Sequence, residues 1–277
     1  LTARMDHGGG IMITGEYINK IHSRIQESRP VVHCITNIVT VNDCANVLLA
    51  VGASPTMAHH PMEVEEITSG SSALVCNMGA VSDIDAMLIA GRTAHRLGHP
   101  VVLDPVGVSG SGFRRGRCLS LIHEIVPTCI RGNYSEIRAL MEQRSTAAGV
   151  DSGDDGIDIT AMKQFAESCK AIVIAAGAVD IITDGRTACT CKNGSPEMAR
   201  ITGSGCMSSA MLGAFLYAEP SVKAAAACCV YMGIAGERAA KKTEAVGGGT
   251  MTFREYFIDE ISLMGPDSYE NIFLSYE

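Results

Sequence analysis

The chain has 277 residues, of which 47% are hydrophobic, so it can bury a large core as one large α/β domain or two smaller ones. Polar residues and glycines interrupt every apolar run before it reaches the roughly 18–20 residues of a membrane helix, so we expect a soluble protein without a membrane partner. A net charge of −8, no tryptophan and only 5% aromatic residues exclude the basic and stacking surfaces of a nucleic-acid-binding protein.

Two further features concern the cell compartment and the domain limits. The eleven cysteines form no C-x-x-C pair and no disulfide-like spacing, which predicts free thiols in a reduced, cytoplasmic protein. Residues 1–11 contain no apolar targeting segment, and we interpret them as an artificial remnant or a disordered tail. Residues 12–277 are then predicted to form a single domain, because the polar loop over 144–156 does not look like a linker between two cores.

From about residue 30, short β-branched segments alternate with helical ones. Strands are predicted at 30–36, 72–79, 99–107, 124–133 and 171–177, and helices at 41–53, 82–97, 112–125, 135–144, 159–169, 205–217, 221–241 and 252–264. Ser82 and Asp85 resemble a capping box at the start of the second helix. Strands that are apolar on both faces predict a mostly parallel sheet covered by helices on both sides. Asp184-Gly185 predicts a type I′ hairpin that adds an antiparallel edge.

In open parallel sheets, ligands bind beyond the carboxyl ends of the strands, so the residues after each predicted strand are the candidates for a site. Those residues are Asn37, Asn77, Asp104, Asn133 with Glu136, Gly177, and finally the segment from Gly203 to Cys206.

The segment "ITGSGC" (201–206) is typical of an anion hole at a helix start. Gly203 and Gly205 let consecutive N–H groups, those of Ser204 and Cys206 included, point into one hollow where the helix dipole favours negative charge. A helix N-terminus also lowers thiol pKa values, to about 3.5–7.5 in known cases. Cys206 could therefore take a proton from an acceptor hydroxyl beside a bound phosphate. The alternatives are an ordinary glycine turn and a small buried cysteine.

Charged residues near the carboxyl edge of the predicted sheet suit phosphoryl transfer. Asp104 and Glu136 could hold Mg²⁺ through water, and Arg131 could neutralise phosphate charge. The alternatives are a turn residue for Asp104, a helix-start residue for Glu136 and a solvated charge for Arg131.

Four collinear segments resemble the hydroxyethylthiazole kinase family of the ribokinase-like superfamily. They are "VHCITNIVTVNDCANVLLAVGASPTMAH" (32–59), "VVLDPVGVSGSGFR" (101–114), "RGNYSEI" (131–137) and "TGSGCMSSA" (202–210). The resemblance implies a three-layer α/β/α sandwich without a lid and a homotrimer with active sites between subunits. It also implies phosphorylation of 4-methyl-5-(2-hydroxyethyl)thiazole by ATP with Mg²⁺, for thiamine salvage.

The resemblance also implies a role for individual residues. Cys206 looks like the catalytic thiol, and Gly203, Ser204, Gly205 and Cys206 look like the hole for the transferred phosphate. Asn37 and Met57, with Gly203 beside them, match thiazole contacts. Arg131, Asn133 and Ala176 match the ATP side, and Asp104 and Glu136 match the acids near magnesium. Ala176 departs from the family, which usually has a hydroxyl residue there, and this puts the ATP affinity in question.

Three alternatives stay open from the sequence. A hydroxymethylpyrimidine or pyridoxal kinase would share the anion hole. A cysteine hydrolase would need a histidine partner, for which His33 and His95 are the candidates. A protein that binds thiazole and nucleotide but has lost activity through Ala176 is the third.

Overall fold

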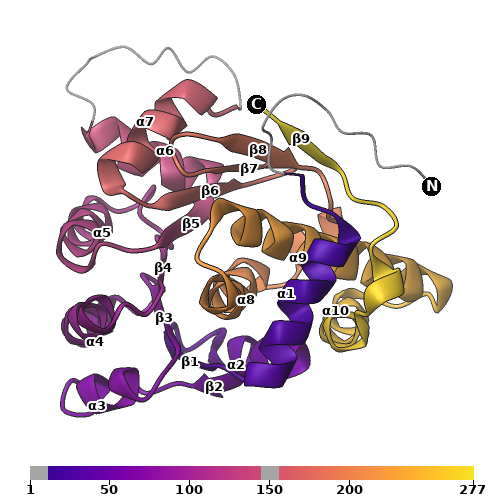
Figure 1. The fold of residues 1–277 in the computed structure, drawn as a ribbon, viewed down its shortest axis with the longest axis horizontal. Helices are drawn as coiled ribbons and strands as arrows, with labels where there is room; N and C mark the ends of the chain where they lie inside the picture. The colour runs from indigo at the N-terminus through magenta and orange to yellow at the C-terminus, as the bar shows by residue number, and fades with distance from the viewer. Residues whose placement is uncertain (1–11, 145–155) are drawn as a thin grey trace.

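The structure, a computed structural model, describes residues 12–144 and 156–277, which form one nine-stranded sheet in the order β2-β1-β3-β4-β5-β6-β7-β8-β9 (Figure 1). The strands are β1 (Val31–Ile35), β2 (Ser54–Thr56), β3 (Ala73–Asn77), β4 (Val101–Asp104), β5 (Cys129–Asn133), β6 (Ile172–Ala176), β7 (Asp180–Thr183), β8 (Ala188–Cys191) and β9 (Leu274–Tyr276). Strands β1 to β6 are parallel, with helices in the crossover connections that parallel strands need, whereas β7, β8 and β9 each run antiparallel to the strand before them in the sheet.

Helices cover both faces of the sheet. On one face lie α1 (Gly15–Ser28), α2 (Val41–Val51), α8 (Ser204–Ala218), α9 (Val222–Ala245) and α10 (Thr250–Leu263), and on the other α3 (Val64–Ser69), α4 (Ile84–Leu97), α5 (Gly112–Ile125), α6 (Tyr134–Arg144) and α7 (Ile159–Cys169) (Figure 1). Three short 3₁₀ turns are η1 (Val81–Asp83), η2 (Pro196–Arg200) and η3 (Pro266–Ser268). In the two described ranges, no helix combines the length and apolarity needed to cross a membrane.

The core consists of two apolar clusters separated by the sheet. Successive strand residues alternate between them: Val75 and Val102 belong to the cluster under α8, whereas Leu74 and Leu103 belong to the cluster under α4 and α5. Because β3 and β4 are buried on both faces, they read as continuous apolar runs in the sequence. The predicted three-layer α/β/α fold is confirmed.

The sequence missed some elements and misjudged two local details. Helices α1 and α3 and the short strands β2 and β9 were not predicted. The predicted hairpin joins β7 and β8, but its loop spans 184–187, and Asp184 accepts hydrogen bonds from the amides of Arg186 and Thr187 instead of adopting the positive φ of a type I′ turn. The capping box was wrong, because Ser82 lies in η1 and α4 begins at Ile84 without a side-chain cap.

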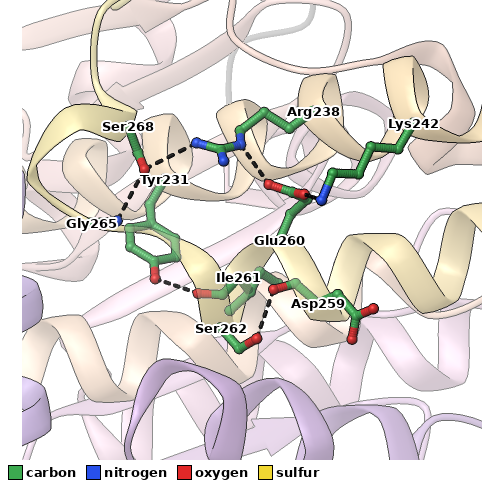
Figure 2. A network of polar contacts seen from close by, with 9 residues as sticks. All are labelled: Tyr231, Arg238, Lys242, Asp259, Glu260, Ile261, Ser262, Gly265 and Ser268. Atoms are coloured by element: carbon green, nitrogen blue, oxygen red, sulfur yellow. Dashed lines mark hydrogen bonds and ion pairs between the residues drawn. The ribbon is translucent and has the colours of Figure 1, made fainter. Parts of the chain in front are cut away.

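A charged network joins α9, α10 and η3 on the sheet face that carries α8 (Figure 2). The side chain of Glu260 is fully buried, and it forms ion pairs with Arg238 and Lys242 of α9. Arg238 also donates to the Ser268 hydroxyl, and the Tyr231 hydroxyl donates to the backbone carbonyl that follows Glu260. This network fixes α10 against α9.

Candidate active site

Polar side chains from neighbouring strands meet at the carboxyl edge of the parallel sheet. Asn37 lies in the turn after β1, Asn77 ends β3 and Asp104 ends β4. The strand register pairs Asn77 with Asp104. The first turn of α8 reaches the same place, because the Cys206 sulfur accepts hydrogen bonds from Asn37 Nδ2 at 3.4 Å and Asn77 Nδ2 at 3.2 Å. The structure thus brings together Asn37, Asp104 and Cys206, as the sequence predicted.

The start of α8 has the geometry of an anion site. Its N-cap, Gly203, has φ +85°, and a Cβ atom there would lie 2.5 Å from Thr40 Cγ2, so glycine is required. No side chain of the described residues caps this helix, which leaves its first amides available to a ligand. A Cβ atom at Gly205 would lie 2.7 Å from Arg131 Nη1, so the guanidinium rests against the same turn. Backbone donors and a cation converge there.

The environment of Cys206 differs from the prediction in one respect. Burial raises the pKa of the Cys206 thiol above its ordinary value, and the negative charge of Asp104 raises the pKa further. Hydrogen bonds donated by Asn37 and Asn77 act in the opposite direction but do not offset these two effects. The lowered pKa expected from the helix N-terminus is therefore not found. At neutral pH, the thiol form predominates.

Asp104 is almost fully buried behind the thiol. Its Oδ2 atom accepts hydrogen bonds from Ser209 Oγ at 2.8 Å and Asn77 Nδ2 at 3.0 Å. Burial raises the pKa of Asp104 to about 6, although the positive charge of Arg131 opposes this rise. Its carboxylate is thus held in one orientation by neutral donors, with a cation nearby.

Glu136 is held by backbone amides. Its Oε1 atom accepts from Gly107 N at 3.0 Å and its Oε2 atom from Asn133 N at 2.9 Å. These contacts join the loop after β4 to the start of α6. Glu136 also lies close enough to Asp104 for its charge to raise the pKa of Asp104. Two carboxylates near an anion site suit Mg²⁺, which takes one or two protein carboxylates and completes its shell with water and phosphate oxygens.

A cavity of about 500 Å³ extends from the start of α8 past β5, β6 and β8 to α9. Arg131 and Ala176, two of the residues that the resemblance assigns to ATP, line it together with Ser204 and Ser208 of α8. Asn133 does not line the cavity: its Oδ1 atom accepts from the Glu136 amide and starts α6.

The lining of this cavity also includes residues that the sequence analysis did not single out. Asp180, Lys192 and Met232 are among them. The hairpin signal could have pointed to Asp180 and Lys192, because they begin β7 and follow β8.

The residues expected to contact the acceptor follow β1 and β2. Met57, directly after β2, is partly buried against the same apolar cluster as Cys206. Buried His33 holds this segment, since its Nε2 atom contacts Ala58 O at 2.7 Å and its Nδ1 atom contacts the Thr68 hydroxyl. His95 is exposed on α4, on the opposite face of the sheet from α8. Neither histidine is placed as the partner of a cysteine nucleophile.

Comparisons with known proteins agree with this geometry. Residues 22–266 match the model of the hydroxyethylthiazole kinase family. A hydroxyethylthiazole kinase of Desulfovibrio desulfuricans is 42% identical over 259 residues, which cover 87% of this chain and 91% of that protein. The chain belongs to the hydroxyethylthiazole kinase family. It is therefore a phosphotransferase.

Solved structures support the family and its fold. The structure of a hydroxyethylthiazole kinase from Pyrococcus horikoshii superposes with a TM-score of 0.83 at 32% identity, and the match covers 95% of this chain and 99% of that one. A ribokinase-like superfamily protein from Enterococcus faecalis, 11% identical with a TM-score of 0.60 over 92% of this chain and 96% of that one, shares the fold. The chain thus has the ribokinase-like fold that the sequence predicted.

Proposed function

We propose that the chain phosphorylates the hydroxyl of 4-methyl-5-(2-hydroxyethyl)thiazole with ATP and Mg²⁺, and that Cys206 is the general base. One observation carries this proposal. The Cys206 sulfur, in the uncapped first turn of α8, accepts a hydrogen bond from Asn37 on the proposed acceptor side, and Ser204 of the same turn lines the cavity proposed for the nucleotide. An acceptor hydroxyl and a γ-phosphate brought to this point would meet beside the sulfur.

The proposed step moves one proton and one phosphoryl group. The Cys206 thiolate takes the proton of the acceptor hydroxyl, so an S–H bond forms as the O–H bond breaks. The acceptor oxygen bonds to the γ-phosphorus while the bond from this phosphorus to the bridging oxygen of ADP breaks. Amides of Gly205 and Cys206, with Arg131, face the charge of the transferred group. Because phosphoryl transfer depends mainly on positioning and charge, a base with a small thiolate fraction suffices.

Asp104 and Glu136 are the residues that we propose near magnesium. Their carboxylate oxygens are hard ligands, and within the described residues no group of three or more acidic, histidine or cysteine side chains could chelate an ion. This donor set fits an ion bound jointly by the protein and the nucleotide, rather than by a closed protein cage. Bound Mg²⁺ would neutralise phosphate charge.

ATP is proposed to occupy the cavity beside α8 despite Ala176. The alanine removes a hydroxyl from the end of β6, but the hydroxyls of Ser204 and Ser208 line the same cavity. Arg131 is available there as a cation. A complete loss of nucleotide binding is therefore not expected, and activity is the better-supported proposal.

We further propose a homotrimer with the site near a subunit boundary. Ile38, Val39 and Met62 are exposed apolar side chains close in sequence to Asn37 and Met57, with exposed fractions of 90%, 67% and 87%. A neighbouring subunit would cover them. Multi-angle light scattering should give three times the mass of one chain, and a monomeric mass would contradict the proposal.

Cytoplasmic location and a single kinase domain over 12–277 complete the proposal. All eleven cysteines are free thiols, which suits a reducing compartment. The described residues of both halves contribute strands to the same sheet, which supports one domain.

The acceptor specificity can be tested by measuring ADP formation from ATP with and without hydroxyethylthiazole. Hydroxymethylpyrimidine and pyridoxal serve as control acceptors, because kinases for them are the alternatives within the superfamily. ADP formation that depends on hydroxyethylthiazole is the expected result. Equal or higher kcat/KM with either control acceptor would overturn the proposed substrate.

A further inference from the structure

The side-chain amide of Asn77 connects the thiol and the buried acid. Its Nδ2 atom donates to Asp104 Oδ2 at 3.0 Å and to the Cys206 sulfur at 3.2 Å. An amide nitrogen carries two hydrogens, so these two acceptors use its full donor capacity. With only 1% of its surface exposed, Asn77 has no room to exchange either partner for bulk water.

The orientation of this amide is determined by its other end. Asn77 Oδ1 accepts from Gly79 N at 2.8 Å and from Asn37 Nδ2 at 3.3 Å. If the amide were flipped, its oxygen would face the Asp104 carboxylate and its NH₂ group would face the Gly79 N–H. Both contacts would be repulsive, so only the orientation that donates to sulfur satisfies all partners.

Asn37 is oriented in the same way. Its Oδ1 atom accepts from the amides of Val39 and Thr40, both at 3.1 Å, which turns its NH₂ group toward Cys206. Two amide donors therefore converge on one sulfur. Hydrogen bonds donated to a sulfur favour its thiolate form over its thiol form and restrict the direction of its lone pairs.

Gly79 allows this close arrangement. A Cβ atom there would lie 2.7 Å from Asn77 Oδ1 and 2.8 Å from Asn37 Cβ, closer than such atoms approach each other. Any other residue at position 79 would displace both amides.

We propose that Asn77 is a positioning residue for phosphoryl transfer, which holds the Cys206 sulfur as a hydrogen-bond acceptor at a fixed place beside Asp104. The inference rests on the proposed role of Cys206 as the base. Asn77 itself needs no contact with substrate. It acts through the sulfur, so when the sulfur is absent, only the effect of its bond to Asp104 should remain.

A double-mutant cycle on the full-length enzyme tests this dependence. Asn77→Ser should lower kcat about tenfold or more while the KM for ATP changes less than twofold, because a hydrogen bond to a charged group is lost in the reacting state. Asn77→Ser and Ser209→Ala are then each made in the Cys206→Ala enzyme. There, Asn77→Ser should lower the remaining kcat by no more than Ser209→Ala does. Ser209→Ala is the matched control, because it removes the other donor to Asp104 Oδ2 and leaves the sulfur untouched.

Gly79→Ala keeps every polar group but displaces the side-chain amides of Asn37 and Asn77. If Asn77→Ser does not fold, Gly79→Ala takes its place in the double-mutant cycle. An equal loss of kcat for the Asn77 or Gly79 variant in both backgrounds would overturn the inference while leaving the base role intact. Wild-type kcat in Cys206→Ala alone would overturn the base role itself, and the inference with it.

Discussion

Two buried polar clusters of this molecule, the α9–α10 network and the group around Asp104, use their charges differently. In the α9–α10 network, the Glu260 carboxylate is neutralised by two cations, Arg238 and Lys242, and those cations extend toward solvent. At the edge of the sheet, the hydrogen bonds that the described residues donate to Asp104 come from neutral groups, and Arg131 lies against the first turn of α8 beside the cavity. The first cluster pairs its acid with cations of its own, whereas the second retains a cation and backbone donors for a ligand. This difference separates a structural network from a site.

The largest effect is expected at the thiol. Cys206→Ala should lower kcat by about 10²- to 10⁴-fold, because base catalysis typically contributes that much. Affinities for ATP and hydroxyethylthiazole, measured by calorimetry, should change little because the sulfur is not proposed to bind either ligand. A large loss of either affinity with unchanged kcat would assign Cys206 to binding instead.

The second largest effect is expected at the two carboxylates proposed near magnesium. Asp104→Asn and Glu136→Gln preserve shape but remove charge near the proposed magnesium, so each should cost about 10- to 100-fold in kcat/KM for MgATP. Raising the Mg²⁺ concentration should recover part of this loss, and thermal melting should show that both variants fold. If both variants keep wild-type rates at limiting Mg²⁺, neither carboxylate belongs to the ion site.

The α9–α10 network should respond in stability instead of rate. Glu260→Gln should lower the free energy of unfolding by about 1–3 kcal/mol, because charge-assisted hydrogen bonds are lost. We expect a value in the lower part of this range, because Arg238 and Lys242 are partly exposed to solvent. The kcat should stay within twofold. Glu255→Gln, the same change at an exposed position of α10, serves as the control and should shift stability by less than about 0.5 kcal/mol. Urea unfolding measures both variants.

The smallest effect is expected at the end of β6. Ala176→Thr should lower the KM for ATP about two- to tenfold, which corresponds to one neutral hydrogen bond. The cavity beside Ala176 has space for the larger side chain. An unchanged or higher KM in steady-state kinetics would mean that this loop does not contact the nucleotide phosphates.

How much the sequence could predict depended on whether the signal was local. The apolar runs of β3 and β4 and the helical periodicity of α4 determine their elements directly. Parallel strands bring their carboxyl ends to one edge, so Asp104 and Cys206 could be placed together. Strand β9 has partly exposed residues and forms only by pairing with β8, a contact that local sequence does not encode. The raised pKa of Cys206 and the bonds of Asn77 depend on burial by distant segments, so the sequence could indicate neither.

The pH dependence of kcat in wild type and Cys206→Asp tests the central claim, that the Cys206 sulfur takes the acceptor's proton. A base works only when deprotonated. Because burial and Asp104 raise the pKa of the thiol, wild-type kcat should climb with pH through the neutral range into the alkaline range. A carboxyl group ionises at much lower pH than a thiol, so the acidic limb of Cys206→Asp should move to lower pH. Identical acidic limbs in the two enzymes would contradict the account.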